Sequence, residues 1–391
     1  MRGSIVKRKG CKTYSIVISQ KDEGGKWRQK WLSTGARTKK EAQASLTEVL
    51  HQINTGTYVS PSKLTVGDYL TQWLRDYTEL NCSPKTIESY QQLISSHLIP
   101  ELGNIKLVEL EARHLQAMYA KKKDSGLSAR TVRYLYSMMA QSLGHAVKQG
   151  LLYRNVALNT EPPRIEHKAI NTLEPQHLTS FLESAKDTPY FALFYLLLHT
   201  GMRRGEALAL KWKHVDMGLA SLGIQAYLSV TQSLGKVNGN ILVKEPKTGA
   251  GKRRVALPPS LTLVLKQHRQ AEEALRAALG AKLTEEDYVF CHSDGSSYDP
   301  STVSHAFSKV VRRAGLPPMP LHGLRHSHAT MLLEAGIHPR VVMERLGHSS
   351  IRVTLDTYSH VVGGLQELAA QKFDDFIEAK NQFISHPLAK Q

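Results

Sequence analysis

Cysteine and long hydrophobic segments are scarce in this chain. Three of its 391 residues are cysteine, and they lie far apart without a CxxC motif: Cys11, Cys82 and Cys291. This spacing excludes a zinc ribbon and a disulfide framework, and it is typical of a protein from a reducing compartment. The longest apolar run, residues 190–198, falls far short of the ~20 residues that span a bilayer. The basic residues 1–9 precede no apolar segment, so we expect neither a signal peptide nor a membrane partner.

Signatures of nucleotide and metal chemistry are also missing. No G-x-x-x-x-G-K-[ST] loop is present, so ATP hydrolysis is not indicated. A two-metal nuclease needs several converging carboxylates, but the acidic pair near the C-terminus, Asp374-Asp375, is typical of a helix surface. Three histidines cluster at 322, 326 and 328, yet no Glu of an H-E-x-x-H motif and no cysteine accompanies them. We therefore expect no metal and no cofactor.

Positive charge is in clear excess. Lys and Arg number 51 and Asp and Glu number 34, which gives a formal charge of +17. Such an excess indicates a polyanionic partner, with DNA or RNA first, although charge alone does not separate nucleic acid from an anionic membrane surface. Residues 1–58 are the most basic segment for their size, with 12 Lys or Arg against 4 Asp or Glu.

The basic residues 1–58 have the pattern of strands followed by a helix. Short β-branched or alternating runs predict the strands and a capped run predicts the helix: Ser4–Lys9, Tyr14–Ser19, Lys26–Leu32 and then Thr38–His51. A three-stranded basic sheet fits the DNA major groove, which admits a β-ribbon. The candidate contacts, interleaved with Trp27 and Trp31, are Lys26, Arg28 and Lys30. The alternative is a small α+β domain whose lysines only keep it in solution.

Residues 65–158 are predicted to be helical. Ser83-Pro84 has the pattern of a helix start, and a long helix is expected over Ser128–Gly150. Basic residues of this segment are candidate DNA contacts, although a charged run is usually a solvated surface. These candidates are Lys121, Lys122, Arg130 and Arg133.

A linker at 159–171 with two prolines precedes a third segment, 172–380. This segment is mainly helical in pattern, with a strand region at 221–257 in which Asn238-Gly239 is a strong hairpin signal. At about 100–200 residues per domain, the chain length corresponds to two or three domains. The expected fold class is therefore multidomain α+β, with domains at 1–58, 65–158 and 172–380.

Four short motifs in the third segment carry polar residues suited to phosphate chemistry. They are Arg203 with Glu206, His322-x-x-Arg325, His348 after Leu346-Gly347, and Tyr358. Each has an ordinary explanation by itself, such as a surface ion pair, a solvated helix face or a packed aromatic ring. Their order and spacing as a set point to one shared site.

The set resembles the tyrosine recombinases, and among them the bacteriophage-type integrases. The catalytic pattern of that family is Arg, Lys, His-x-x-Arg, His or Trp, then Tyr, and the matching residues are Arg203, Lys247, His322, Arg325, His348 and Tyr358. Glu206 matches the supporting acid of the first box. Arg204 leaves the choice of the first arginine open, and two neighbours of Lys247 leave the choice of the lysine open: Lys244 and Lys252.

Physical chemistry agrees with the roles that the resemblance implies. Two guanidiniums, Arg203 and Arg325, can grip the non-bridging oxygens of a phosphate in pairs and stabilise developing negative charge, with a further hydrogen bond from His348. A tyrosine nucleophile of pKa ~10 has to lose its proton, and His322 is the base suited to that transfer. The resemblance gives Lys247 the role of general acid toward the leaving 5′ oxygen. Glu206 would orient a neighbouring group.

The resemblance implies a particular architecture and set of partners. It implies an arm-binding domain, a SAM-like helical core-binding domain and a mainly helical catalytic domain with a small sheet. Double-stranded DNA would be bound at core and arm attachment sites by a homotetramer, with an excisionase or a host DNA-bending protein as candidate partners. The enzyme would integrate or excise a phage genome or a conjugative transposon in the bacterial cytoplasm, at the nucleoid. The C-terminal residues 365–378 would dock on a neighbouring subunit or pack in cis.

Two other readings compete with a recombinase. A repressor or an architectural DNA-binding protein would keep the basic domains and would have no need of Tyr358. A type IB topoisomerase would share the chemistry but would have no use for a second DNA-binding domain directed to arm sites.

Overall fold

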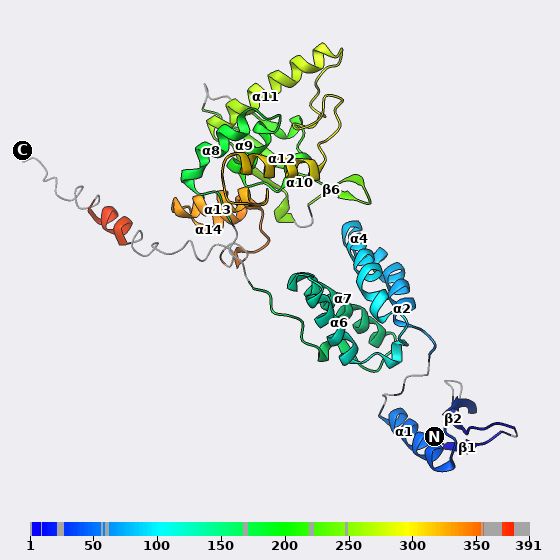
Figure 1. Cartoon of the computed structure of the whole chain (residues 1–391). Coiled ribbons are helices and arrows are strands. Elements are labelled where there is room, and N and C mark those ends of the chain that lie inside the picture. Colours follow the sequence, from blue (N-terminus) through cyan, green and yellow to red (C-terminus); the bar gives the residue numbers. More distant parts are fainter. Residues whose placement is uncertain are drawn as a thin grey trace, which may run out of the picture. The chain divides into compact units, whose positions relative to one another are not determined.

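The fold was determined as a computed structural model of the whole chain (Figure 1). It describes all residues except 1, 9, 22–26, 56–57, 59–61, 167–170, 219–222, 247–248, 353–354, 356–369 and 379–391. The chain divides into two units, residues 1–166 and 167–391, which are described separately below.

The first unit begins with an antiparallel sheet and a helix. Its strands run in the order β1 (Arg2–Val6), β2 (Ser15–Lys21) and β3 (Trp27–Ser33), and α1 (Lys39–Asn54) follows. Ile16 and Ile18 of β2 are buried in a cluster with Leu46 of α1, because alternate residues of a strand share one face. Thr38 and Glu41 form the expected capping box at the start of α1. The predicted strands and helix are thus confirmed.

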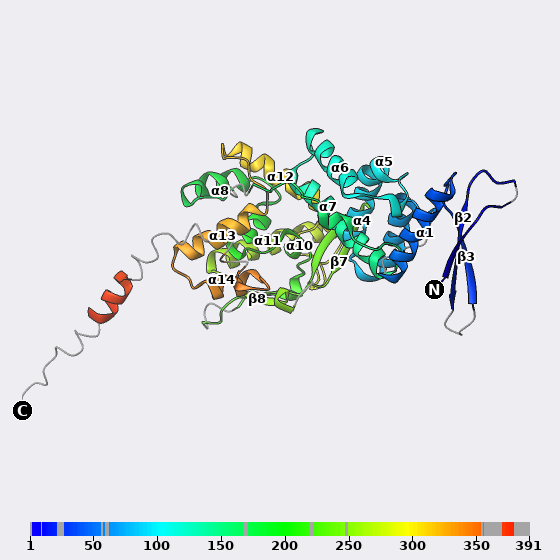
Figure 2. The same ribbon diagram turned by 90° about the horizontal axis from the view of Figure 1, so that it is seen from below.

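The third strand, β3, is an edge of this sheet (Figure 2), and six of its seven residues are exposed. Trp27 and Trp31 are 57% and 43% exposed, and Arg28 and Lys30 are exposed as well. The guanidinium of Arg8 lies 4.5 Å from the centre of the Trp31 ring, a cation–π contact that keeps both groups at the surface. The strand therefore presents alternating aromatic and basic side chains to solvent.

The rest of the first unit is helical, as predicted. Its elements are α2 (Val66–Trp73), η1 (Leu74–Thr78), α3 (Glu79–Asn81), α4 (Pro84–Leu93), η2 (Ile94–Leu98), α5 (Ile99–Leu102), η3 (Leu107–Glu109), α6 (Ala112–Asp124), α7 (Ala129–Lys148) and η4 (Val156–Asn159). Ser83 is the N-cap residue of α4, with Pro84 in the first turn, and the Ser128 side chain caps α7 by accepting from the Thr131 N–H. Fully buried leucines from several helices form one core: Leu70, Leu98, Leu115 and Leu135.

The basic candidates of the helical segment have different surroundings. Lys121 and Lys122 both pair with Glu101, at 2.8 and 3.0 Å, and the Lys122 side chain is only 14% exposed. Arg130 and Arg133 lie exposed on α7. Lys122 therefore has a structural partner that its sequence context did not indicate, whereas the two arginines face solvent.

The second unit is mainly helical with two small sheets. Its elements are η5 (Pro175–His177), α8 (Leu178–Lys186), α9 (Phe191–Thr200), α10 (Arg204–Leu208), η6 (Trp212–His214), β4 (Val215–Asp216), β5 (Tyr227–Val230), β6 (Ser233–Val237), β7 (Asn240–Lys244), η8 (Gly249–Gly251), β8 (Arg253–Ala256), α11 (Pro259–Ala278), α12 (Pro300–Arg313), α13 (Gly323–Glu334) and α14 (Pro339–Leu346). Residues 370–378 are also helical.

Helix α9 is the centre of this unit. It coincides with the longest apolar run of the sequence and is buried on most sides, as expected for a helix that is hydrophobic all round. Phe181 of α8 and Phe307 of α12 pack with Phe194 of α9. No helix among the described residues has the length and hydropathy needed to cross a lipid bilayer.

The predicted strand region forms two antiparallel sheets. One has the order β4-β5-β8, and the other is the hairpin β6–β7. Asn238 and Gly239 make its turn with φ values of +48° and +82°, the conformation for which Asn-Gly is favoured. The hairpin signal of the sequence is therefore confirmed.

Two helices end at glycines in the left-handed conformation, and these ends lie close together. Gly201 terminates α9 with φ +63°, and Gly347 terminates α14 with φ +68°. A Cβ on Gly201 would lie 2.5 Å from Leu346 Cδ2 and 2.7 Å from His328 Cδ2. Both the backbone and the packing therefore require glycine at position 201.

The Gly201→Ala substitution should destabilise the protein more than a glycine replacement that only strains the backbone. Gly280 is the matched control, because its φ is +72° and a Cβ there would have no neighbour within 4 Å. We expect Gly280→Ala to cost about 1–2 kcal/mol. Gly201→Ala should cost a further ~1–3 kcal/mol because of the two close contacts. Urea unfolding measures both, and equal losses would contradict the packing argument.

Candidate active site

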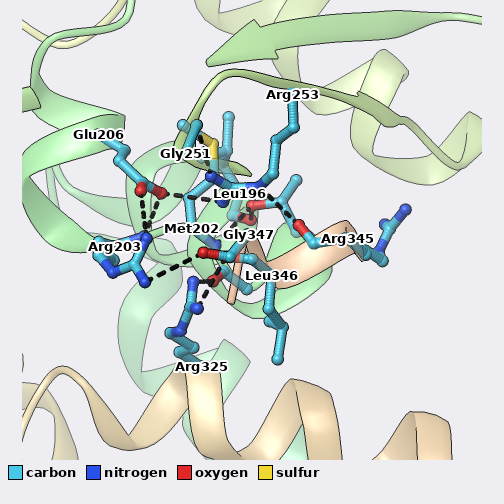
Figure 3. Close-up of polar contacts among 12 residues, drawn as sticks. Leu196, Met202, Arg203, Glu206, Gly251, Arg253, Arg325, Arg345, Leu346 and Gly347 are labelled. Carbon is cyan, nitrogen blue, oxygen red and sulfur yellow. Dashed lines mark hydrogen bonds and ion pairs between the residues drawn. The ribbon is translucent and has the colours of Figure 1, made fainter. Parts of the chain in front are cut away.

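A cluster of arginines lies where the ends of α9 and α14 meet α10 and α13 (Figure 3), and two histidines lie beside it. Arg203 stands at the N-cap of α10, and Arg325 lies in the first turn of α13. His322 is the N-cap residue of α13, and His348 follows Gly347 at the end of α14. The fold thus brings together residues that are up to 145 positions apart, from Arg203 to His348.

Arg325 is the most deeply placed member of the cluster. Its side chain is 3% exposed, and its two terminal nitrogens donate to the carbonyls of Gly201 and Leu346, each at 2.7 Å. These carbonyls stand at the C-terminal ends of α9 and α14, where the helix dipole favours a positive charge. The guanidinium plane is therefore fixed by the backbone itself.

Arg203 is the more accessible guanidinium, with 43% of its side chain exposed. Its Nη1 lies 2.8 Å from Glu206 Oε1, and its Nη2 donates to the Gly347 carbonyl at 3.4 Å. The neighbouring Arg204 turns away and donates to Pro300 and Ser304 of α12. Of the two adjacent arginines, it is Arg203 that lies in the cluster.

Glu206 is a buried carboxylate held between positive groups. It is 3% exposed, accepts from the Arg203 backbone N–H at 2.8 Å, and pairs with Arg253 Nη2 at 2.9 Å. Burial alone would raise the pKa of Glu206, but the hydrogen bond and charge of Arg253 and the donors of Arg203 outweigh it, so the pKa is lowered. Glu206 is therefore ionised at neutral pH and orients Arg203.

The site histidines are neutral at pH 7. Desolvation, followed by the charges of His326 and Arg325, lowers the pKa of His322 to about 4, although part of its ring remains exposed. Desolvation and the charges of Arg325 and Arg203 likewise lower the pKa of His348 to about 4. Neutral imidazoles beside two guanidiniums can each accept one proton and donate one hydrogen bond.

Arg345 and His328 form a second arginine–histidine pair, which lies next to the cluster. Arg345 Nε donates to Nε2 of the buried His328 at 3.0 Å, and its terminal nitrogens donate to the carbonyls of Ala256 and His199. Desolvation and the Arg345 charge lower the pKa of His328 to about 3. Since His328 accepts from Arg345, its role here is to position α14 against α9 and β8.

The other residues predicted for the site are placed as follows. Lys247, Tyr358 and, in the first unit, Lys26 lie outside the described residues. Of the alternative lysines, Lys252 pairs with Glu245 at 2.7 Å, and Lys244 is the last residue of β7. All three lysines therefore stay candidates for the general acid.

Sequence reasoning missed Arg253 and Arg345. Arg253 lies in the basic run 252–254, and Arg345 follows Glu344 near the end of a helical pattern, so both look like ordinary surface charge. The available signal was the apolar run Val255–Leu257 that follows the basic pair in β8, which indicates a strand with a buried face. Nothing local indicated that a charged side chain would occupy that face.

The histidine cluster at 322, 326 and 328 does not have the arrangement of a metal site. The rings of His322 and His326 meet edge to face at 4.9 Å, while His328 accepts from Arg345. Among the described residues, no group of three His, Cys, Asp or Glu side chains is arranged to hold a metal ion.

Three family models match successive parts of the chain. Residues 4–53 match the Arm DNA-binding domain, and residues 65–123 match the phage integrase N-terminal SAM-like domain. Residues 168–363 match the phage integrase family, and this range includes the cluster described above.

Curated relatives and solved structures agree with these matches. A tyrosine recombinase XerC-like protein of Caldanaerobacter subterraneus is 30% identical over 94% of this chain and 97% of its own length. The ICEBs1 integrase of Bacillus subtilis is 27% identical over 76% of this chain and 80% of its own. The Tn1549 transposon integrase, solved with a circular intermediate DNA, has a TM-score of 0.67 at 19% identity, covering 79% of this chain and 99% of that one. A lambda integrase tetramer on a Holliday junction has a TM-score of 0.59 at 18% identity, covering 88% and 92%.

The helical fold around the arginine and histidine cluster is that of a tyrosine recombinase. The chain belongs to the phage integrase family and is a site-specific integrase. The resemblance seen in the four sequence motifs is confirmed, and so is the expected fold class.

The lowered pKa of the buried His328 predicts a pH-dependent stability. An unfolded histidine has a pKa of ~6.5, whereas His328 titrates at about 3 when folded, so the unfolded state binds more protons between these values. Stability should therefore fall as the pH drops below 6.5, by up to ~1.4 kcal/mol per pH unit from this one group.

Replacing His328 by Gln should flatten that slope, because glutamine keeps an acceptor for Arg345 but does not titrate. Urea unfolding at several pH values from about 4 to about 7 measures the effect. An unchanged slope in the variant would show that His328 is not the group responsible.

Proposed function

We propose that this integrase cuts and rejoins DNA through a 3′-phosphotyrosine bond to Tyr358, and thereby integrates or excises a mobile element. The observation that supports this most is the convergence of Arg203 and Arg325 on the carbonyl ends of two helices, beside two neutral histidines. Such an arrangement offers two planar cations and two imidazoles to one tetrahedral anion. The element would be a phage genome or a conjugative transposon.

Each residue has a distinct role in the proposed reaction. The Tyr358 oxygen attacks the phosphorus, and the bond from phosphorus to the 5′ oxygen breaks. Arg203 and Arg325 neutralise the charge that develops on the non-bridging oxygens, and His348 donates a further hydrogen bond to them. The pKa of His322, about 4, leaves its ring unprotonated at pH 7, and the negative charge of a bound phosphate would raise that pKa toward the range in which the ring can accept the tyrosine proton.

Lys247 gives its proton to the departing 5′ oxygen in this proposal. The phosphotyrosyl bond retains the energy of the phosphodiester, so a new 5′ hydroxyl can displace the tyrosine without ATP. Attack by that hydroxyl returns the proton to Lys247 and releases the Tyr358 oxygen, which recovers its own proton from His322. No group is consumed, and each proton returns to its donor.

Three domains would share the DNA contacts: residues 1–58 at arm sites, and 65–158 with 172–380 around the core site. The exposed edge strand β3 suits entry into a major groove, with Arg28 and Lys30 as contacts. Lys26, Lys121 and Lys122 remain candidates, and so do Arg130 and Arg133 on α7. Phosphate contacts of this kind release counterions, so affinity should fall as salt is raised.

The assembly that we propose is a homotetramer on two duplexes in the bacterial cytoplasm, at the nucleoid. Residues 370–378 form a helix on which Phe373 and Ile377 are exposed, as a segment that docks on a neighbouring subunit requires. An excisionase or a host DNA-bending protein would set the direction of the reaction.

A nicked suicide duplex carrying the attachment site tests the proposed chemistry. Wild type should form a protein–DNA adduct that survives SDS, because loss of the short 5′ strand prevents rejoining. Tyr358→Phe should bind the same duplex equally well and form no adduct. A duplex that is bound by wild type without an adduct would contradict covalent catalysis and leave a DNA-binding protein.

Arg203 and Arg204 form a matched pair for testing the phosphate clamp. Arg203→Lys should slow adduct formation by about 10²–10³-fold, the usual effect of removing one donor to a developing oxyanion. Arg204→Lys should change the rate only a few-fold, because Arg204 bonds to α12 rather than to the cluster. Equal effects of the two substitutions on the single-turnover rate would contradict this assignment.

A further inference from the structure

Arg253, the first residue of β8, is the basic residue most enclosed by the site without belonging to the family pattern. Its side chain is 6% exposed. Nε donates to the carbonyl of Arg345 at 2.7 Å, Nη2 pairs with Glu206 at 2.9 Å, and Nη1 donates to the carbonyl of Gly251 at 3.3 Å (Figure 3). One guanidinium thus joins α10, α14 and the segment that enters β8.

Two of these contacts lie one step from a residue of the proposed clamp. Glu206 holds Arg203 through its other carboxylate oxygen. The Arg345 carbonyl precedes the Leu346 carbonyl, which accepts from Arg325. Arg253 therefore reaches both arginines through an intermediate group.

The end of α14 is shaped to admit this side chain. A Cβ on Gly347 would lie 2.9 Å from Arg253 Nη1, so the glycine that precedes His348 leaves the space which the guanidinium fills. The glycine also ends α14 with φ +68°, which turns the chain toward His348. Arg253 is consequently packed against the turn that presents a third residue of the site.

Charge gives a second reason for Arg253. Glu206 is almost fully buried, and a buried carboxylate is stable only when it is paired. Two cations share it, but Arg203 is largely exposed and is the one that a phosphate would compete for. Arg253 keeps the carboxylate ionised while Arg203 turns to a ligand.

We propose that Arg253 is a positioning residue for DNA cleavage, which holds Glu206 and the end of α14 in register so that Arg203, Arg325 and His348 meet one phosphate. This inference rests on the proposed function above. Only a planar group with donors in three directions makes all three contacts, so lysine should not replace it.

Arg254 provides a matched control in the adjacent position. Its side chain faces solvent, and its guanidinium lies 4.6 Å from the centre of the Tyr227 ring on β5. A substitution there removes the same charge from the same strand but leaves Glu206 and α14 untouched.

The experiment compares full-length wild type, Arg253→Gln, Arg253→Lys and Arg254→Gln in single-turnover cleavage of the suicide duplex at saturating protein. We expect Arg253→Gln to slow adduct formation by about 10²-fold, the effect of a small misplacement of catalytic groups. Duplex affinity should change less than about threefold, since a positioning residue acts on the rate and not on phosphate binding. For Arg254→Gln, the rate of adduct formation and the duplex affinity should each stay within about threefold of wild type.

A pH profile separates positioning from a merely structural role. The charged and titratable groups that face Glu206 are Arg203, Arg253 and His322. In Arg253→Gln the carboxylate loses one of its two guanidiniums, so its pKa rises and protonation releases Arg203. The rate relative to wild type should then increase as the pH is raised through the titration of Glu206. Arg253→Lys keeps the charge and should be slow, by about tenfold or more, without this pH dependence.

The outcomes are distinct. The positioning role would be overturned if Arg253→Gln and Arg253→Lys both cleaved within threefold of the wild-type rate and both kept the pH profile of wild type. If Arg253→Gln fails to fold, the lysine variant decides: a folded Arg253→Lys protein at the wild-type rate overturns the proposal, and a slow one supports it. Absence of an adduct with wild type would instead reject the function on which the inference rests.

Discussion

The buried guanidinium of Arg325 between two helix ends is the interaction on which the rest of the site depends. A cation that is 3% exposed is stable only if its donors are satisfied, and here the carbonyls of Gly201 and Leu346 accept from it. Those carbonyls are available because α9 and α14 stop there, each at a left-handed glycine. The two helix ends are also the places to which Arg203 and His348 are attached. The ends of α9 and α14 therefore make the burial of Arg325 possible and at the same time place Arg203 and His348 in the site.

Much of the fold follows from local rules in the sequence. The Thr38 and Glu41 cap, the Asn238-Gly239 turn and the apolar run of α9 each act within a few residues, so their outcome was predictable. The cluster itself was predictable only as a set of motifs, because residues 203 and 348 meet through tertiary packing. The sequence favours Arg203 over Arg204 because Glu206 follows Arg203 by three residues, as in the family, whereas the contact of Arg204 with α12 comes from tertiary packing that no local pattern encodes.

Arg253, Arg345 and Lys122 show the limit of reading charge from sequence. Arg253 and Lys122 lie in basic runs and Arg345 follows a glutamate, patterns that are typical of a solvated surface, yet each is held by specific partners in the fold. Their burial is decided by distant groups, namely Glu206, His328 and Glu101. A basic protein can therefore use a part of its positive charge for internal structure, and the net charge overstates what is available to a polyanion.

The edge strand β3 has a consequence for the protein when it is alone. An unpaired strand edge is a template for pairing with a second chain, and the bulky Trp27 and Trp31 add apolar surface that favours such pairing. Arg28 and Lys30 lie between the tryptophans on this same edge. Two copies that approached edge to edge would bring these positive charges together, so the residues that we propose as DNA contacts would also disfavour pairing of the free protein along this edge.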